Sequence, residues 1–244
     1  DKVHIVAHSM GGLVARSYLE YSFGPKVSKF IMLGTPNYGS GDIYVLQEAG
    51  EKPDSYSTAL QNIIDFYLWY LRIVDDEITD DFLSVQQHIQ SAKELMPIYD
   101  YLKDSTTQEI IPYSTHSENE GTLSRNIFLE QLNETDNIQQ MVDQTDEIHI
   151  IAGTNQETLY TIPIIPDDDP TTDQWTDGVP FPNPPELDSL EGDGTVPLVS
   201  ARIDDPCLEP RPDPIFQAYQ YIKNIIGFPT AHAQLFCGSY TEEE

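Results

Sequence analysis

One serine stands in a sequence context suited to nucleophilic catalysis. Ser9 lies in AHSMGG (residues 7–12), which follows the apolar run VHIVA and precedes apolar residues at helical spacing. A sharp turn between a strand and a helix exposes such a serine, and the start of the helix favours developing negative charge. Ala7 and Gly11 supply the small residues that this turn demands, although the usual pattern has Gly in place of Ala7. We predict that Ser9 is a nucleophile and that the Met10 N–H helps to bind an oxyanion; a serine in an ordinary glycine-rich turn is the alternative.

A serine hydroxyl becomes a good nucleophile only when a positioned base takes its proton. Where a nucleophile elbow is used, the chain order is serine, acid, histidine. His232 is the one histidine that comes late in the sequence and follows helix and strand breakers, including Gly227 and Pro229. The other histidines precede or adjoin the serine, fall in a helical region or lie in a strand: His4, His8, His88, His116 and His149. We therefore predict that His232 is the base.

The acid is expected between the serine and this histidine. Asp193 lies in EGDGTVP, where the flanking glycines allow a tight turn at the end of a strand. Asp188, Asp204 and Asp205 are rivals without this framing. Together, Ser9, Asp193 and His232 predict a serine hydrolase that cleaves carboxylic esters through an acyl-enzyme. An acyltransferase would use the same residues with an alcohol in place of water, and a non-catalytic surface or binding module that retains the fold is the alternative from another class.

The elements that must position these residues indicate an α/β fold. VHIVA, KFIMLG (residues 29–34) and EIHIIAG (residues 147–153) are short apolar runs typical of buried parallel strands. TVPLVSA (residues 195–201) is expected as a short strand or the end of a strand, residues 163–185 as a loop, and residues 214–226 as the last helix. The expected sheet begins at the nucleophile strand, so we expect roughly the first third of a complete domain to be missing and the segment alone to be insoluble or weakly active.

Between the second and third of these strands the sequence reads as mainly helical. Helices are expected at 59–74, at 81–101 with a capping box formed by Ser91 and Glu94, and at 125–133. We predict a hydrolase core made of residues 1–41 and 146–244, interrupted by a helical cap or lid insertion at residues 42–145.

With these residues placed, the chain resembles the lipase and lecithin:cholesterol acyltransferase-like branch of the α/β-hydrolases. AHSMGGLVAR, LGTPNYGS, SAKELMPIYDYL and GDGTVPLVSA are similar to family segments around the nucleophile, the next strand, the cap and the acid. The segment around His232 is a weaker match. The resemblance implies a partial parallel sheet, the triad above and a cap over an acyl pocket. It implies that Phe66, Leu68, Trp69, Tyr70 and Leu71 line this pocket or contact a lipid surface; an ordinary cap core is the alternative.

Composition limits the partners. The chain of 244 residues has 41 acidic and 12 basic residues, a net charge of −29. Such a surface repels nucleic acid, so the expected partner is a small-molecule or lipid ester, with transient contact to a lipid interface. No cofactor is expected. Calcium could bind to a run of aspartates, for which a solvated loop is the alternative: Asp167, Asp168, Asp169, Asp173 and Asp177. A disulfide between Cys207 and Cys237 is an open possibility and would favour an extracellular location.

Overall fold

The computed structural model describes residues 2–21, 27–53, 56–117, 123–165, 174–181, 188–203 and 222–228. The chain forms two compact units. The first comprises Asp1–Tyr38, Phe128–Thr158 and Leu190–Glu244, and the second comprises Gly39–Ile127 and Leu159–Ser189. The predicted insertion covered residues 42–145. The observed bounds place residues 128–145 in the first unit with the predicted core strands, and they place residues 159–189 in the second unit.

A parallel sheet forms the centre of the first unit. Its strands are β1 (Val3–His8), β2 (Val27–Leu33), β5 (Thr145–Gly153) and β9 (Ile222–Phe228), in the order β1-β2-β5-β9. All three pairings are parallel. The expected α/β class with a parallel sheet is therefore confirmed.

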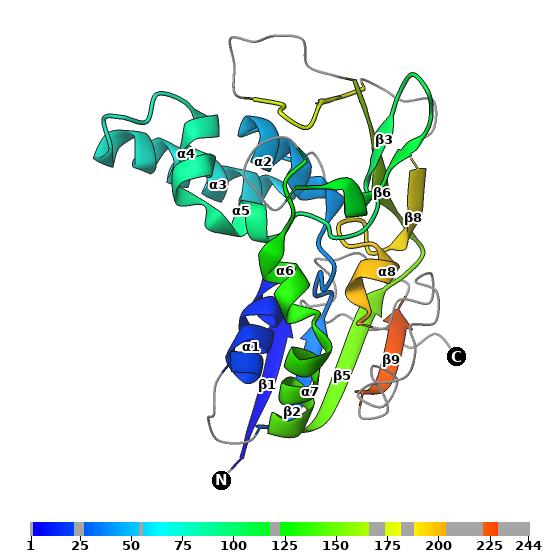
Figure 1. Cartoon of the computed structure of the whole chain (residues 1–244). Coiled ribbons are helices and arrows are strands. Elements are labelled where there is room, and N and C mark those ends of the chain that lie inside the picture. Colours follow the sequence, from blue (N-terminus) through cyan, green and yellow to red (C-terminus); the bar gives the residue numbers. More distant parts are fainter. Residues whose placement is uncertain are drawn as a thin grey trace. The chain divides into compact units, whose positions relative to one another are not determined.

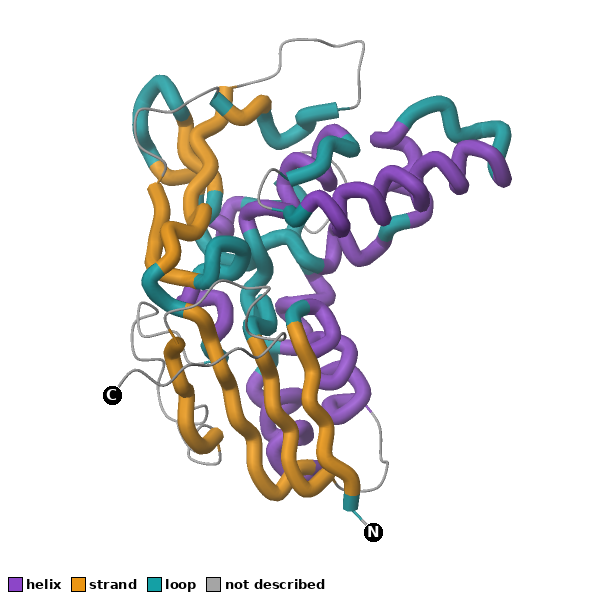
Figure 2. Tube along the Cα trace, turned by 180° about the vertical axis from the view of Figure 1, so that it is seen from behind, coloured by secondary structure: helices purple, strands orange, loops and turns teal. Residues whose placement is uncertain are grey.

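Two helices cover one face of this sheet. They are α1 (Met10–Tyr21) and α7 (Thr135–Gln144), which lie side by side in front of the strands in Figure 1 and behind them in Figure 2. On β2, Phe30 and Met32 are fully buried, and on β5 Ile148 and Ile150 are buried in the same alternation. Because successive strand residues point to opposite faces, these four side chains share one face, where they pack with residues of α1 and α7 in one core cluster.

Three shorter elements complete the first unit or join it to the second. The helix α6 (Ile127–Leu132) precedes α7, the strand β8 (Asp188–Gly192) precedes Asp193, and the helix α8 (Leu198–Ala201) follows it. The sequence predicted a strand for residues 195–201, and this was wrong for its second half. Leu198–Ala201 forms a helical turn that begins after Pro197, while Gly192 and Pro197 form an isolated β-bridge.

The second unit contains helices and a sheet. The helical elements are η1 (Gly41–Ile43), α2 (Tyr44–Ala49), α3 (Thr58–Val74), α4 (Asp81–His88), α5 (Gln90–Glu94) and η2 (Tyr113–Thr115). The strands are β3 (Leu102–Asp104), β4 (Ile110–Ile111), β6 (Gln156–Ile165) and β7 (Val179–Pro180). Their order is β4-β3-β6-β7, with β8 also paired to β6.

Three local expectations were wrong. The predicted capping box fails because Ser91 lies inside α5, whose N-cap is Ile89 without a side-chain cap. Residues 163–165, expected in a loop, end β6, and residues 222–226, expected in a helix, lie in β9. In β9 the pairing with β5 determines the strand, and local apolar spacing alone does not reveal that partner. In the part of the chain described above, no helix has the length and apolar character needed to cross a membrane.

Candidate active site

Ser9 occupies the turn between β1 and α1 in a strained backbone conformation. Its φ is +53°, in the left-handed region that non-glycine residues rarely adopt. Two backbone hydrogen bonds hold the turn: the Ser9 N–H donates to the Leu33 carbonyl at the end of β2 (2.9 Å), and the Gly12 N–H donates to the Ser9 carbonyl (2.9 Å). Such strain persists only where the surrounding structure imposes it, and it is most common at functional sites.

The glycine that this turn requires is Gly12. A Cβ on Gly12 would lie 1.9 Å from the Oγ1 of Thr35, which is itself fully buried in the loop after β2. A Cβ on Gly11 would meet no described atom within 4 Å. Gly11 was expected to meet this steric requirement, and that prediction was wrong. The close approach of α1 to the loop after β2 places the requirement one residue later.

Met10 is the first residue of α1 and directly follows Ser9. The first N–H groups of a helix have no partner within the helix and carry its positive dipole end. The Met10 backbone is therefore in a suitable element to supply an oxyanion donor, while its side chain is exposed.

Asp193 is buried in a tight loop between β8 and α8, which we call the acid loop (residues 193–197). Its side chain is 2% exposed. Its Oδ1 accepts hydrogen bonds from the N–H groups of Thr195 (3.0 Å) and Val196 (2.7 Å). Gly194 has a φ of +91° and donates its N–H to the Oγ1 of Thr158 (2.8 Å). The loop thus fixes one carboxylate oxygen against the backbone.

The acid loop lies at the carboxyl end of β5. Val196 and Ala201 form a buried cluster with Ala152, which is the second-last residue of that strand. Ser9 follows the carboxyl end of β1, and β2 lies between β1 and β5. Since the strands are parallel, Ser9 and the acid loop occupy the same edge of one sheet, where open α/β sheets usually place their ligands.

His232 lies outside the described residues, and so do Asp204 and Asp205, the later rivals to Asp193. The last described strand before it is β9, whose Phe228 pairs with Gly153 at the carboxyl end of β5. The chain therefore leaves β9 at the same edge of the sheet, a short distance in sequence before His232. Asp188, the earlier rival, is the first residue of β8.

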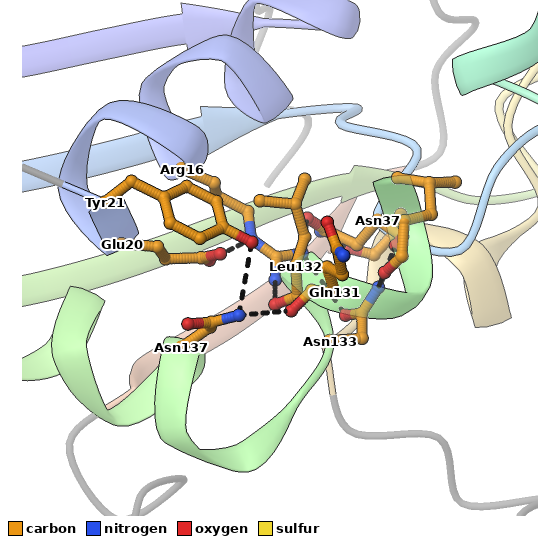
Figure 3. Close-up of polar contacts among 10 residues, drawn as sticks. Arg16, Glu20, Tyr21, Asn37, Gln131, Leu132, Asn133 and Asn137 are labelled. Carbon is orange, nitrogen blue, oxygen red and sulfur yellow. Dashed lines mark hydrogen bonds and ion pairs between the residues drawn. The ribbon is translucent and has the colours of Figure 1, made fainter. Parts of the chain in front are cut away.

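A buried polar network surrounds Arg16 and was not predicted from the sequence. Arg16 on α1 is fully buried and forms an ion pair with Glu20 (3.0 Å). Its Nη1 donates to the Oδ1 of Asn37 (2.8 Å) and of Asn133 (3.3 Å), and its Nη2 donates to the Leu132 carbonyl (2.5 Å; Figure 3). Desolvation raises the pKa of the Glu20 carboxyl, while Arg16 acts in the opposite direction. Arginine at this position gave no signal in the sequence, because most of its partners are distant along the chain.

The predicted substrate-binding residues are on α3 in the second unit. Phe66, Trp69 and Tyr70 are 65%, 52% and 47% exposed, and the Phe66 and Trp69 rings contact each other with centroids 5.6 Å apart. Leu68 and Leu71, which were predicted together with these three, are the only buried residues of this helix, as the cap-core alternative expects. The alternative of an ordinary cap core therefore does not apply to these three side chains in the described structure.

The remaining candidates are either outside the described residues or have other partners. Cys207, Cys237 and four of the five aspartates proposed for calcium fall outside them. The fifth, Asp177, is buried and accepts the Leu123 N–H. Within the described ranges, no group of three or more His, Cys, Asp or Glu side chains is arranged to hold a metal ion.

No protein-family model and no curated protein matches this chain. We therefore infer its function from the residues and geometry described above.

Proposed function

We propose that this protein is a serine hydrolase of the α/β-hydrolase type that cleaves carboxylic esters. The observation that carries the proposal is the positive φ of Ser9, held between a parallel strand and a helix by the hydrogen bond to Leu33. A strained serine on a strand-to-helix turn is the geometry that exposes a nucleophile at the carboxyl edge of a sheet. The buried Asp193 on the same edge supports the assignment of the acid.

In the proposed reaction, the Ser9 Oγ forms a bond to the ester carbonyl carbon and its proton passes to His232. The Met10 N–H stabilises the oxyanion, and His232 gives the proton to the departing alcohol as the ester bond breaks. Water then attacks the acyl-enzyme, with His232 again taking the proton and returning it to Ser9. The products are a carboxylic acid and an alcohol. Asp193 orients His232 and stabilises its charged form.

The acyl or lipid class of the substrate has support from α3. Its exposed apolar side chains are Leu60, Ile63, Phe66, Tyr67, Trp69, Tyr70, Ile73 and Val74. Exposed apolar surface of this extent marks a site of interaction with a partner, a ligand or a lipid surface. An ester with a long acyl chain, presented in an aggregate or at an interface, fits this surface better than a small polar ester.

The experiment that tests the proposal is an ester-hydrolysis assay of the full-length protein, with p-nitrophenyl esters of increasing acyl length. Ser9→Ala and His232→Ala should each lower kcat by about 10⁴ or more, since removal of a triad member disables the whole unit. Wild-type turnover retained by Ser9→Ala would reject the proposed function. Loss in Ser9→Ala with normal turnover in His232→Ala would reject only the assignment of the base.

A further inference from the structure

The side-chain amide of Asn37 joins α1, the helix that follows Ser9, to α8, the helix that follows the acid loop. Asn37 lies in the loop after β2 and is fully buried. Its Oδ1 accepts from the Arg16 guanidinium (2.8 Å), and its Nδ2 donates to the Ala201 carbonyl (2.9 Å). Because a guanidinium only donates and a carbonyl only accepts, the amide has one orientation that satisfies both partners.

On one side, this amide is connected to the nucleophile. Arg16 lies on α1, the helix that begins immediately after Ser9. The guanidinium is fully buried and holds this helix to the Leu132 carbonyl at the end of α6. Several hydrogen bonds therefore fix the position of the guanidinium. Through it, the Asn37 Oδ1 is connected to α1.

On the other side, the amide is connected to the acid. Ala201 is the last residue of α8, which follows the acid loop directly. Tyr38, which follows Asn37 in the loop after β2, binds the same segment. Its N–H donates to the carbonyl and the Oγ of Ser200 (3.3 and 3.2 Å), and its hydroxyl donates to the Ile203 carbonyl. Residues 37 and 38 thus form hydrogen bonds with three residues of the segment that follows Asp193, namely Ser200, Ala201 and Ile203.

We propose that Asn37 is a positioning residue that fixes the acid loop relative to α1, the helix that follows Ser9. In this way it aligns Asp193 with the proposed base, His232. The inference rests on the proposed function, since the alignment matters only for a reaction that uses Ser9 and Asp193. Asn37 acts through Arg16 and Ala201 and has no role in bond making. A displacement of about 1 Å in a catalytic group typically costs about 10²-fold in rate, which is the scale of effect expected here.

The substitution Asn37→Asp separates the two ends of this connection. A carboxylate keeps an acceptor for Arg16 but places a second acceptor against the Ala201 carbonyl, where the amide had a donor. Ala201 and the acid loop before it should therefore move away from residue 37, while Arg16 of α1 keeps its hydrogen-bond acceptor. If Asp193 no longer faces the base, the charged form of the base loses stabilisation and its pKa falls.

The experiment measures kcat, KM and the pH dependence of kcat/KM in the full-length protein. For Asn37→Asp we expect kcat to fall about 10- to 100-fold with KM within about threefold, and the acidic limb of the profile to move to lower pH. Asn137→Asp is the matched control. It makes the same change in the same unit, but the side chain of Asn137 donates to the Tyr21 hydroxyl (3.2 Å) and the Gln131 carbonyl (2.7 Å), neither of which belongs to residues 37–38 or 198–203.

The control should keep kcat within about threefold of wild type and leave the acidic limb unchanged. If Asn37→Asp does not fold, Asn37→Ala removes the same bond without a buried charge and should show the same two effects. Ser9→Ala in the same assay separates the two possible failures. Absence of Ser9-dependent turnover in the wild type rejects the proposed function. Ser9-dependent turnover with unchanged kcat and acidic limb in the folded Asn37 variant rejects the positioning role alone.

Discussion

Glu48 and Asp177 form a buried pair of acidic residues in the second unit. The Glu48 Oε2 accepts the backbone N–H of Asp177 (3.1 Å) and the hydroxyl of Thr176 (3.0 Å), and both acidic side chains are less than a tenth exposed. Burial raises the pKa of Asp177 from 3.8 to about 7, with the Glu48 charge acting in the same direction. Burial likewise raises the pKa of the Glu48 carboxyl.

This pair predicts that the second unit loses stability as the pH rises. A raised pKa in the folded state means that folded protein binds a proton which unfolded protein has already released, so the stabilisation is present below pH 3.8 and lost as the pH approaches about 7. Asp177→Asn should remove this contribution. Its free energy of unfolding relative to wild type should therefore rise between pH 5 and pH 8, by a few kcal/mol at about 1.4 kcal/mol per pKa unit.

Urea denaturation at several pH values measures this difference. Asp76→Asn is the control, because Asp76 is an exposed aspartate of the same unit. An Asp177→Asn curve that stays parallel to the wild-type curve over this range would show that the carboxyl of Asp177 is not protonated in the folded protein near neutral pH.

An added methyl group is expected to have opposite effects on stability at Gly12 and at Gly11. Gly12→Ala places a Cβ against the buried Thr35 side chain, so we expect a loss of about 1–3 kcal/mol in the free energy of unfolding and a fall in activity. Gly11→Ala has no described atom in the way and lies inside α1, so it should leave the stability unchanged or raise it by about 0.5–1 kcal/mol. Thermal unfolding of the two variants compares them directly. Equal destabilisation would mean that α1 does not approach Thr35 as described.

The exposed aromatic side chains of α3 predict a dependence on substrate length. The double variant Phe66→Ser and Trp69→Ser should reduce hydrolysis of aggregated long-chain esters by about 10- to 100-fold, because it removes apolar surface worth about 1.5–3 kcal/mol. Hydrolysis of soluble short-chain esters should be unchanged. Ile110→Ser is the control, since Ile110 is another exposed apolar residue, on β4. An equal loss on both ester classes, or no loss on either, would remove α3 from the account of substrate binding.

Local sequence signals were sufficient for the elements with strong apolar patterns. The runs before Ser9, at residues 29–34 and at 147–153 are strands of one parallel sheet, and the predicted helix at 59–74 is α3 (Thr58–Val74). In each case the residues that define the pattern are neighbours in sequence. The turn at Ser9 is of the same kind, because its small residues and its flanking strand and helix are contiguous.

Elements that depend on distant partners could not be predicted in this way. The strand β6 contains Pro163, which lacks a backbone donor and argues against a strand. Its carbonyl nevertheless accepts the Phe181 N–H (2.8 Å), and residues 162–165 of β6 are paired with β3 and β7. The bond from Asn37 to Ala201 joins residues 164 positions apart, so no local pattern reports it. The connection between the elements of the candidate site is therefore visible only in the fold.

Covalent labelling tests directly whether Ser9 is a nucleophile activated by its surroundings. The full-length protein is treated with a fluorophosphonate, which forms a bond to an activated serine with loss of fluoride, and the modified residue is located by mass spectrometry of peptides. We predict a single adduct on Ser9 that is absent from Ser9→Ala and strongly reduced in His232→Ala. Folded protein that acquires no adduct at Ser9, or that is labelled equally in Ser9→Ala, would contradict the account.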